Sequence, residues 1–578
     1  MDPKSFYIKE SAEQFDAIVV GSGITGGWAA KELTERGLKT LMVERGRPVE
    51  HRTDYVGENR APWTMPNRGL VDAKLADEQY FNQKKCYAFD EHTKQFWMND
   101  RDMPYSTPEG RPFSWIRGNQ LGGKSLLWAR QSYRWSDLDF EANLKDGHGV
   151  DWPIRYADLA PWYSHVERFV GISGGVENLP VLPDSEFQPA WEFNAVEAAF
   201  KKKFDANFGA SRMIMGRCAH LTKPTEQQLA LGRGQCQARS QCHRGCSFGA
   251  YFSTQSSTLP AALATGRLKV ATNSIVHSVI YDPKTNRATG VRVIDSETMA
   301  TREYHAKVIF MCASTLATTA ILLNSTSSSF PNGIGNSSGV LGHYLMDHLY
   351  GAGASGRVEG FEDSYYQGRR PTGPIIPRFR NVTDKHPDFL RGYSLSGGAA
   401  REGWAGHGNE PGFGKEFKAR ISRPGPWHFS LGGSGEMLPR YDNQVSLHPT
   451  KKDKWGMPQL HIDCRFTDND LKMQKDIADT AANILDMLGV KDIHQNIKSG
   501  TEWPPGLTIH EVGTARMGRD PKTSYLNGNN QSHDVPNLFV TDGACMASVA
   551  WQNPSLTFMA ITARAAAFAA EQVKLGKL

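Results

Sequence analysis

The sequence contains few cysteines, no long apolar run and no excess of charge of one sign. Eight cysteines in 578 residues are too few and too unevenly placed to form a disulfide scaffold. The 66 basic and 61 acidic residues nearly balance, and no basic tract favours nucleic-acid binding. The most apolar C-terminal stretch, residues 556–570, is rich in alanine and is interrupted by Arg564. It is typical of a packed helix, so we expect no direct membrane span.

Residues 1–14 are polar and charged and lack the apolar core of a secretion signal. We therefore expect the chain either to stay in the cytoplasm or to be exported with a partner. Hydrophobic residues make up 39% of the chain, and 56 glycines and 31 prolines interrupt it. This composition indicates a globular α/β protein with many turns, and the length predicts two closely joined domains.

The clearest motif lies near the N-terminus. A buried strand at residues 15–20 runs into Gly21-Ser22-Gly23-Ile24-Thr25-Gly26, and a helical stretch from Trp28 to Arg36 follows. A second strand at residues 40–43 ends at Glu44. This order of strand, G-x-G-x-x-G, helix, strand and acid predicts a bound dinucleotide. A tight βα turn without a ligand is the alternative interpretation.

Each residue type in this motif has a physical role. Gly21 permits the tight turn, Gly23 lets a pyrophosphate approach the backbone, and Gly26 allows the helix to pack closely on the strand. The helix N-terminus offers free N–H groups and a positive dipole end to the phosphates. Glu44 is placed to accept hydrogen bonds from an adenosine ribose.

The rest of the chain alternates strands, helices and glycine-rich turns. We predict a second glycine-rich turn at residues 117–128 and helices at residues 315–324 and 468–488. We predict strands at residues 268–276, 290–294, 307–312 and 537–542. Residues 358–426 show little periodicity, and we expect loops and sheet edges there, around a substrate cavity. Dinucleotide-type strands at both ends of the chain predict one discontinuous domain with a substrate domain threaded through it.

The sequence resembles the glucose–methanol–choline (GMC) oxidoreductase family along nearly its whole length. The most specific matches are residues 510–518 (His-Glu-Val-Gly-Thr-Ala-Arg-Met-Gly), 537–543 (Asn-Leu-Phe-Val-Thr-Asp-Gly) and 553–557 (Asn-Pro-Ser-Leu-Thr). The turn at residues 118–123 and the run from Ser314 to Leu323 also match. The resemblance implies an α/β fold in which a Rossmann-like FAD-binding domain is interleaved with a sheet-and-helix substrate domain. It assigns residues 1–170, 230–345 and 500–578 to the former, with a cysteine loop at 234–250, and residues 171–229 and 346–499 to the latter.

The resemblance also implies that FAD is the dinucleotide, with its ring facing His510 and Asn553. The residues expected to contact it are Gly21, Gly23, Ile24, Thr25, Gly26, Glu44, Arg45, Gly118, Gly122, Gly123, Ser125, Val276, Asp542, Gly543 and Thr557. The family's glycine turn is matched imperfectly, because Lys124 stands where a small residue is usual. No histidine lies between Gly118 and Trp128, so we predict non-covalent FAD.

His510 and Asn553 suit the oxidation of an alcohol. Hydride loss from a carbinol carbon yields a carbonyl only if the hydroxyl proton also departs, and a neutral imidazole can accept that proton. On the match, His510 is the base and Asn553 holds the substrate oxygen, while the flavin receives the hydride. The alternatives are a structural histidine and an Asn-Pro turn.

Three cysteines crowd together at positions 236, 242 and 246, in a C-x5-C-x3-C pattern. A zinc site completed by His243, and ordinary reduced cysteines, are two interpretations. The third is an iron–sulfur cluster, which suits soft thiolate ligands. The spacing resembles that of the bacterial FAD sugar dehydrogenases within the GMC family, and this implies that Cys236, Cys242 and Cys246 bind a three-iron, four-sulfur cluster. We interpret the other five cysteines as structural.

The resemblance implies a dehydrogenase that oxidises a sugar hydroxyl and passes electrons through the cluster to a cytochrome or quinone. The leading assignment is C3 of glucose or a glucoside, because the chain is longer than expected of the compact C1 type and its glycine turn differs. Glucose 1-, gluconate and fructose dehydrogenases, an oxygen-using pyranose oxidase relative and a non-catalytic relay subunit are alternatives. A small subunit with the export signal and a cytochrome c are the implied partners. They would place the enzyme in the periplasm or at the membrane; a cytoplasmic enzyme is the alternative.

Overall fold

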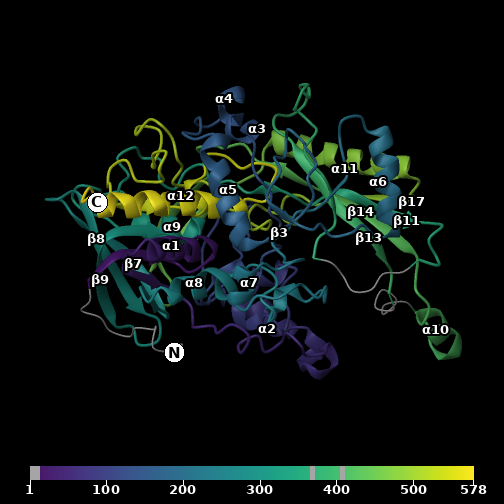
Figure 1. The fold of residues 1–578 in the computed structure, drawn as a ribbon, viewed down its shortest axis with the longest axis horizontal. Coiled ribbons are helices and arrows are strands. Elements are labelled where there is room, and N and C mark those ends of the chain that lie inside the picture. Colours follow the sequence, from purple (N-terminus) through teal and green to yellow (C-terminus); the bar gives the residue numbers. More distant parts are fainter. Residues whose placement is uncertain (1–13, 365–370, 404–410) are drawn as a thin grey trace.

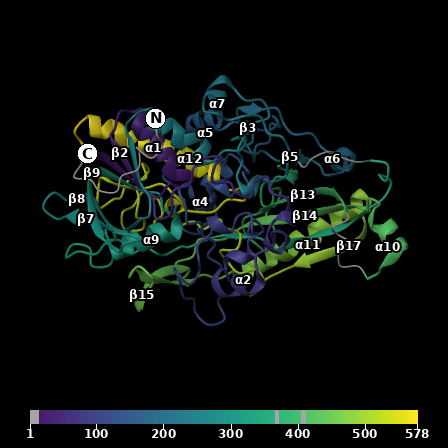
Figure 2. The same cartoon turned by 90° about the horizontal axis from the view of Figure 1, so that it is seen from below.

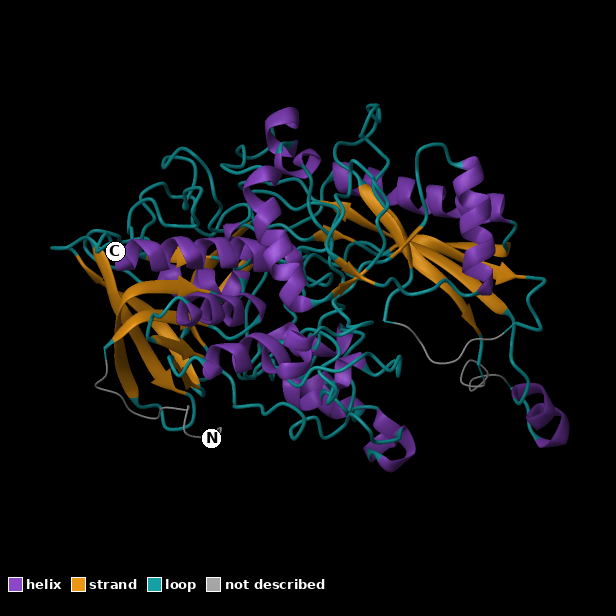
Figure 3. Cartoon of the chain, viewed as in Figure 1, coloured by secondary structure: helices purple, strands orange, loops and turns teal. Residues whose placement is uncertain are grey.

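The computed structural model describes residues 14–364, 371–403 and 411–578. The polar N-terminal segment discussed above therefore lies almost wholly outside the described residues. Within the described ranges, no helix is long and apolar enough to cross a membrane. Two seven-stranded sheets lie toward opposite ends of the molecule, with helices and loops between them (Figures 1 and 3).

The first sheet carries the N-terminal motif. Its order is β6 (Leu268–Ala271), β2 (Thr40–Val43), β1 (Phe15–Val20), β9 (Thr301–Met311), β8 (Arg287–Asp295) and β7 (Ser274–Asp282), and β18 (Leu538–Val540) also pairs with β9. Strands β6, β2, β1, β9 and β18 pair in parallel, whereas β7 and β8 form antiparallel arms. The strands predicted at both ends of the chain thus meet in one sheet.

Helices α1 (Ile24–Glu35), α5 (Tyr156–Val170) and α12 (Ser555–Lys574) pack beside this sheet, and α12 contacts both of the others (Figure 1). The alanine-rich stretch of α12 is buried against α1 and the sheet, where small side chains such as Ala565 and Ala569 let the helices approach closely. The prediction of a packed C-terminal helix is confirmed.

The second sheet is antiparallel. Its order is β17 (Lys491–Ile497), β11 (Ala352–Val358), β14 (Trp427–Glu436), β13 (Tyr393–Arg401), β12 (Pro374–Ile376) and β5 (Ile214–Met215), with β10 (His348–Leu349) on β14. Helix α11 (Asp468–Leu488) runs along one face of it (Figure 2). Thr467 and Asp470 form a capping box at the start of α11, and Gly489 ends it at a φ of 90°. All strands of this sheet fall within the segments assigned above to the substrate domain.

The prediction for residues 358–426 was wrong in part. Strand β13 is an interior strand that pairs with both β12 and β14, not a sheet edge. The glycines of β13 weaken the sequence pattern by which a strand is predicted. The structure requires them, because a Cβ on Gly397 would lie 1.8 Å from the Ser430 carbonyl oxygen. On the neighbouring strand, a Cβ on Gly433 would lie 2.4 Å from Ile477 of α11. Glycine here allows a close approach of strand and helix.

The remaining α-helices and β-strands lie outside the two large sheets. The predicted helices at residues 315–324 and 468–488 are confirmed as α9 and α11. The elements not yet given are α2 (Ala73–Gln79), α3 (Asp137–Phe140), α4 (Ala142–Asp146), α6 (Ala195–Asn207), α7 (Glu226–Ala230), α8 (Leu259–Ala264), α9 (Thr315–Asn324), α10 (Gly414–Ile421), β3 (Ile172–Ser173), β4 (Phe187–Gln188), β15 (Gln444–Lys452) and β16 (Pro458–Asp463). Strands β15 and β16 form a two-stranded sheet separate from both large ones.

Candidate active site

A cavity of about 580 Å³ runs from the N-terminal glycine loop to His510 and Asn553. It brings together residues from both ends of the chain. All the predicted FAD contacts line it except Gly26, Gly122 and Thr557. Gly26 and Gly122 pack against neighbouring parts of the protein and do not face the cavity. The hydroxyl of Thr557 lies 2.8 Å from that of Tyr163. The binding roles of the lining residues stay a prediction.

The glycine loop has the shape that a pyrophosphate requires. Gly21 adopts a φ of 94° at the end of β1, and a Cβ on Gly26 would lie 2.0 Å from the Gly21 carbonyl oxygen. A Cβ on Gly23, in contrast, would meet no atom of the described residues within 4 Å. Gly23 is also the N-cap of α1 and has no side chain to cap the first N–H groups of this helix. Free N–H groups beside open space fit a phosphate-bearing cofactor.

Acidic and basic side chains flank the loop. Glu44 is buried, and it accepts hydrogen bonds from the backbone N–H groups of Ser22 (3.0 Å) and Gly46 (2.7 Å). Burial raises the pKa of Glu44, although these hydrogen bonds oppose the rise. Arg45 lies 4.5 Å over the ring of Trp455 and 3.4 Å from Asp453. The carboxylate and the guanidinium therefore supply an acceptor and a positive charge beside the glycine loop.

At the other end of the cavity, His510 is held on three sides. Its backbone N–H donates to Asp347 (3.1 Å), its Nδ1 lies 3.2 Å from Nδ1 of His348, and its Nε2 lies 3.4 Å from the amide nitrogen of Asn553. An amide N–H directed at Nε2 requires that nitrogen to be an acceptor, so the proton of a neutral imidazole sits on Nδ1 and points to His348. Nε2, which faces Asn553, is then free to act as a base.

The electrostatic surroundings keep His510 neutral. Its depth in the protein, the neighbouring His348 and the charge of Lys124 together hold the pKa of His510 well below its usual range. Burial likewise lowers the pKa of His348 to about 4. Burial and the nearby Glu511 raise the pKa of Asp347 to about 7. A neutral imidazole at neutral pH is the form that accepts a proton.

We expect the Lys124→Gln substitution to move the acid limb of the kcat/KM pH profile to higher pH. Removing the positive charge raises the pKa of His510 toward its ordinary value, so the base becomes protonated at a less acidic pH. Lys94→Gln is the control, because Lys94 pairs with Glu91 and does not line the cavity. Identical acid limbs in the wild type and the Lys124 variant would contradict the assignment.

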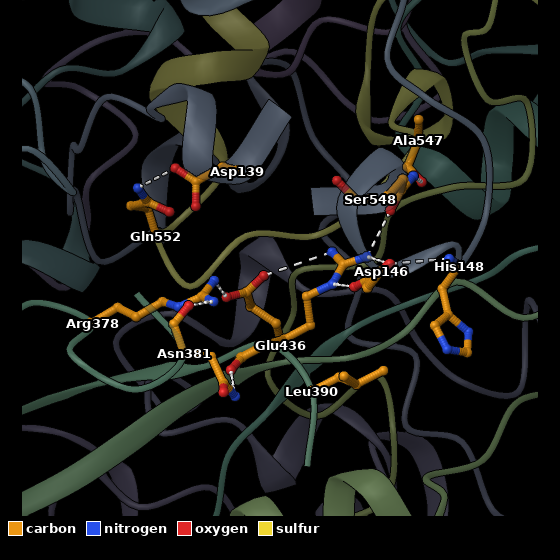
Figure 4. A network of polar contacts seen from close by, with 12 residues as sticks. Asp139, Asp146, His148, Arg378, Asn381, Leu390, Glu436, Ala547, Ser548 and Gln552 are labelled. Carbon is orange, nitrogen blue, oxygen red and sulfur yellow. Dashed lines mark hydrogen bonds and ion pairs between the residues drawn. The ribbon is translucent and has the colours of Figure 1, made fainter. Parts of the chain in front are cut away.

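A network of polar contacts lies around Gln552, the neighbour of Asn553 in the sequence, and includes Glu436 of the second sheet (Figure 4). The amide of Gln552 donates to Asp139 (2.9 Å). Across from this pair, Glu436 of β14 accepts from Arg378 (2.5 Å) and lies 3.8 Å from Arg391. Arg391 in turn pairs with Asp146 at the end of α4. The segment that carries Gln552 and Asn553 is thereby anchored in a largely buried, charged region, in which the side chain of Asp146 is 13% exposed.

Burial and the charge of Glu436 raise the pKa of Asp139 to about 7, above its value in an unfolded chain. The folded state therefore binds the proton more tightly, and this contribution to stability is present below about pH 4 and is lost as the pH rises toward 7. We expect Asp139→Asn, which stays neutral, to raise the melting temperature relative to wild type at pH 8. The gain is at most roughly 4 kcal/mol. At pH 4.5 the difference should shrink toward zero; a difference independent of pH would contradict the inference.

The three clustered cysteines line a second, smaller cavity with His220 and Tyr251. All eight cysteines are free thiols, and burial raises the pKa of Cys236 to about 11. Among the described residues, no group of three histidine, cysteine or acidic side chains converges on a single metal ion. His243 turns toward Asp90 (3.4 Å), and it is His220 that approaches Cys242.

Arg130 connects the two cavities. It lines the larger one, and its guanidinium donates to the carbonyl oxygen of Leu126 (3.3 Å) and to that of Cys242. It also lies 4.1 Å over the ring of Tyr251. Burial opposes its charge, but the neighbouring Cys242 and Tyr251 raise the pKa of Arg130 overall. Its φ of 65° is unusual for a residue with a side chain and marks a constrained turn.

Several residues of the larger cavity were missed by the sequence analysis. The predicted loops at residues 358–426 contribute none of the lining side chains in the described ranges. The cavity is instead bounded near His510 by Tyr350 and Trp503. Residues 457–460 of the β15–β16 hairpin also line it, but this hairpin carries Asp453 and Trp455, which contact Arg45 beside the glycine loop. One signal in the sequence could have indicated His348, because Asp347-His348 is a polar pair between the apolar residues Leu345-Met346 and Leu349.

Comparison with known proteins gives the family. The sequence matches "GMC oxidoreductase" along residues 15–350 and 439–562. The chain therefore belongs to the GMC oxidoreductases and is an FAD-dependent enzyme that acts on CH–OH groups. It is 28% identical to 2-methyl-1,2-propanediol dehydrogenase of Mycolicibacterium austroafricanum, covering 96% of this chain and 95% of that one. It is 26% identical to the fructose dehydrogenase large subunit of Gluconobacter japonicus, covering 97% and 98%. Crystalline pyridoxine 4-oxidase from Mesorbium loti shares the fold, with a TM-score of 0.57 and 16% identity over 97% and 99% of the two chains.

Proposed function

We propose that the enzyme is a dehydrogenase that oxidises a secondary hydroxyl of a sugar, with C3 of glucose or of a glucoside as the leading assignment. The observation that carries the proposal is the pairing of His510 with Asn553 at the end of the cavity, 3.4 Å apart. The neutral imidazole can accept a proton there, and the amide can bind an alcohol oxygen.

In this proposal the side chains manage the proton and the oxygen. Nε2 of His510 takes the hydroxyl proton while the Asn553 amide shares the charge that develops on the oxygen. The resulting imidazolium of His510 keeps its Nδ1 proton and donates it in a hydrogen bond to Nδ1 of His348, 3.2 Å away. Asp347 fixes the His510 backbone so that the ring keeps its position. Non-covalent FAD, held by the glycine loop and Arg45, would accept the hydride that completes the oxidation to a carbonyl.

We further propose that Cys236, Cys242 and Cys246 hold a three-iron, four-sulfur cluster. The donor set supports it: three thiols line one cavity, and in such a cluster each thiolate binds a different iron, so the sulfurs need not converge on one point. Electrons would leave by this group to a cytochrome or quinone. We also propose a small subunit and a cytochrome c as partners, and a periplasmic or membrane-associated location. Similarity to a fructose dehydrogenase large subunit supports the existence of a further subunit.

A second candidate activity is the oxidation of a small diol. It is favoured by the 28% identity to 2-methyl-1,2-propanediol dehydrogenase along nearly the whole of both chains. Both activities need the same base and the same oxygen-holding amide. In this proposal, selection between the two substrates therefore falls to the cavity walls near His510, at Tyr350 and Trp503.

Anaerobic mixing of the flavin-loaded enzyme with methyl glucoside, glucose or 2-methyl-1,2-propanediol separates the candidates. Bleaching of the flavin by methyl glucoside, whose C1 is blocked, supports oxidation at C3. Bleaching by glucose alone moves the assignment to C1, and bleaching by the diol alone supports the second candidate. No bleaching by any of the three would overturn the proposed sugar dehydrogenase. In a separate assay with oxygen present, peroxide formation as fast as dye reduction would overturn it as well.

A further inference from the structure

His220 is a buried histidine that faces the cysteine cavity. Its side chain is only 1% exposed, and its Nε2 lies 3.6 Å from the sulfur of Cys242. The ring sits 5.9 Å from that of Tyr251, and its backbone N–H donates to Cys218 (2.8 Å). Among the described residues, its Nδ1 has no hydrogen-bond partner. The ring is therefore fixed with one nitrogen directed at a sulfur.

The position of the ring proton follows from these contacts. A neutral imidazole has one N–H and one acceptor nitrogen. With the proton on Nδ1, a buried donor would have no partner, which is costly. With the proton on Nε2, the N–H points at the Cys242 sulfur, and only an acceptor nitrogen stays unpaired. The Nε2–H form is the one that the surroundings favour.

We propose that His220 donates this N–H to the Cys242 sulfur and so raises the reduction potential of the iron–sulfur group that the three cysteines bind. The inference rests on the cluster proposed above. A donor to a ligating thiolate withdraws electron density from it and stabilises the more negative, reduced state of the cluster. His220 is thus a tuning residue that acts through Cys242 and is not itself a ligand.

Three variants of the holoenzyme test this role. His220→Leu removes the donor and keeps an apolar side chain of moderate size, whereas His220→Gln places an amide N–H near the position of Nε2. His243→Gln is the matched control, because His243 lies in the same loop but turns to Asp90, 3.4 Å away. The measurements are iron content per chain and the midpoint potential of the cluster, followed by electron paramagnetic resonance in a redox titration.

We expect all three variants to keep the iron of the wild type. His220→Leu should lower the potential so that the equilibrium constant for one-electron reduction falls about tenfold, which corresponds to about 59 mV. His220→Gln should recover most of the difference, and His243→Gln should match wild type. An unchanged potential in His220→Leu would overturn the inference, as would loss of iron from both His220 variants, since that assigns the ring to ligation or folding. Wild-type enzyme without iron would instead refute the cluster itself.

Discussion

His510→Gln should lower kcat for the oxidised alcohol by about 10²- to 10⁴-fold, the range that general-base catalysis contributes. Glutamine fills a similar space beside Asn553 but cannot accept a proton at neutral pH. The glycine loop at the far end of the cavity is untouched, so the flavin content should equal that of wild type. Stopped-flow bleaching of the flavin under anaerobic conditions measures the affected step directly.

The pH profile distinguishes a lost base from a disturbed site. In wild type, kcat/KM should stay level down to a pH well below 6.5, because the pKa of His510 is depressed by its depth in the protein, by His348 and by Lys124. In the glutamine variant the rate should instead rise with pH, as hydroxide takes over removal of the proton. His494→Gln, on the exposed strand β17, is the control. A loss smaller than tenfold would remove His510 from the role of base.

The second large effect is expected from two glycines that stand three residues apart. Gly26→Ala should destabilise the protein itself by about 1–3 kcal/mol or more, because the new Cβ would lie 2.0 Å from the Gly21 carbonyl oxygen and backbone cannot move aside cheaply. Gly23→Ala should leave the melting temperature of the flavin-free protein nearly unchanged, because in the described part of the chain its Cβ meets no atom within 4 Å. The flavin content of Gly23→Ala should nevertheless fall sharply, since the methyl group occupies the approach to the helix N-terminus.

Each glycine variant is the control for the other. Melting temperature of the flavin-free protein and flavin bound per chain are measured for both. A Gly26→Ala protein as stable as wild type would refute the packing argument. A Gly23→Ala protein that keeps its full flavin would show that the pyrophosphate does not pass over this residue.

The sequence predicted those parts of the fold in which the pattern is local. The helix at 468–488 buries one regular face and ends clearly at Gly489. The unit at residues 15–44 is buried nearly all round, and its apolar strands and the glycines between them marked it. Strand β13 was missed because Gly397 and Gly398 weaken its pattern. The reason for those glycines lies in a neighbouring strand, which no local pattern reveals.

In the candidate site, too, residues with a local sequence pattern were predicted, and residues that depend on distant parts of the chain were not. His510 and Asn553 stand in distinctive stretches of sequence, and both line the cavity as expected. The partner of His510 could not be predicted in this way, because His348 is 162 residues away in the sequence. The backbone bridge between Met346 and Val512 brings the two segments together. Arg130 was missed for a similar reason: its significance lies in Cys242, 112 residues further along.

The small β15–β16 sheet has a practical consequence for redesign. Met457, Gln459 and Leu460 reach the wall of the cavity from a hairpin that belongs to neither large sheet. Because Asp453 and Trp455 of the same hairpin contact Arg45 beside the glycine loop, libraries randomised at these three positions would reshape the cavity near that loop while leaving intact the strand ladders that carry β1 and β10. Redesign of cofactor binding should therefore begin in the hairpin, and far from His510 and Asn553.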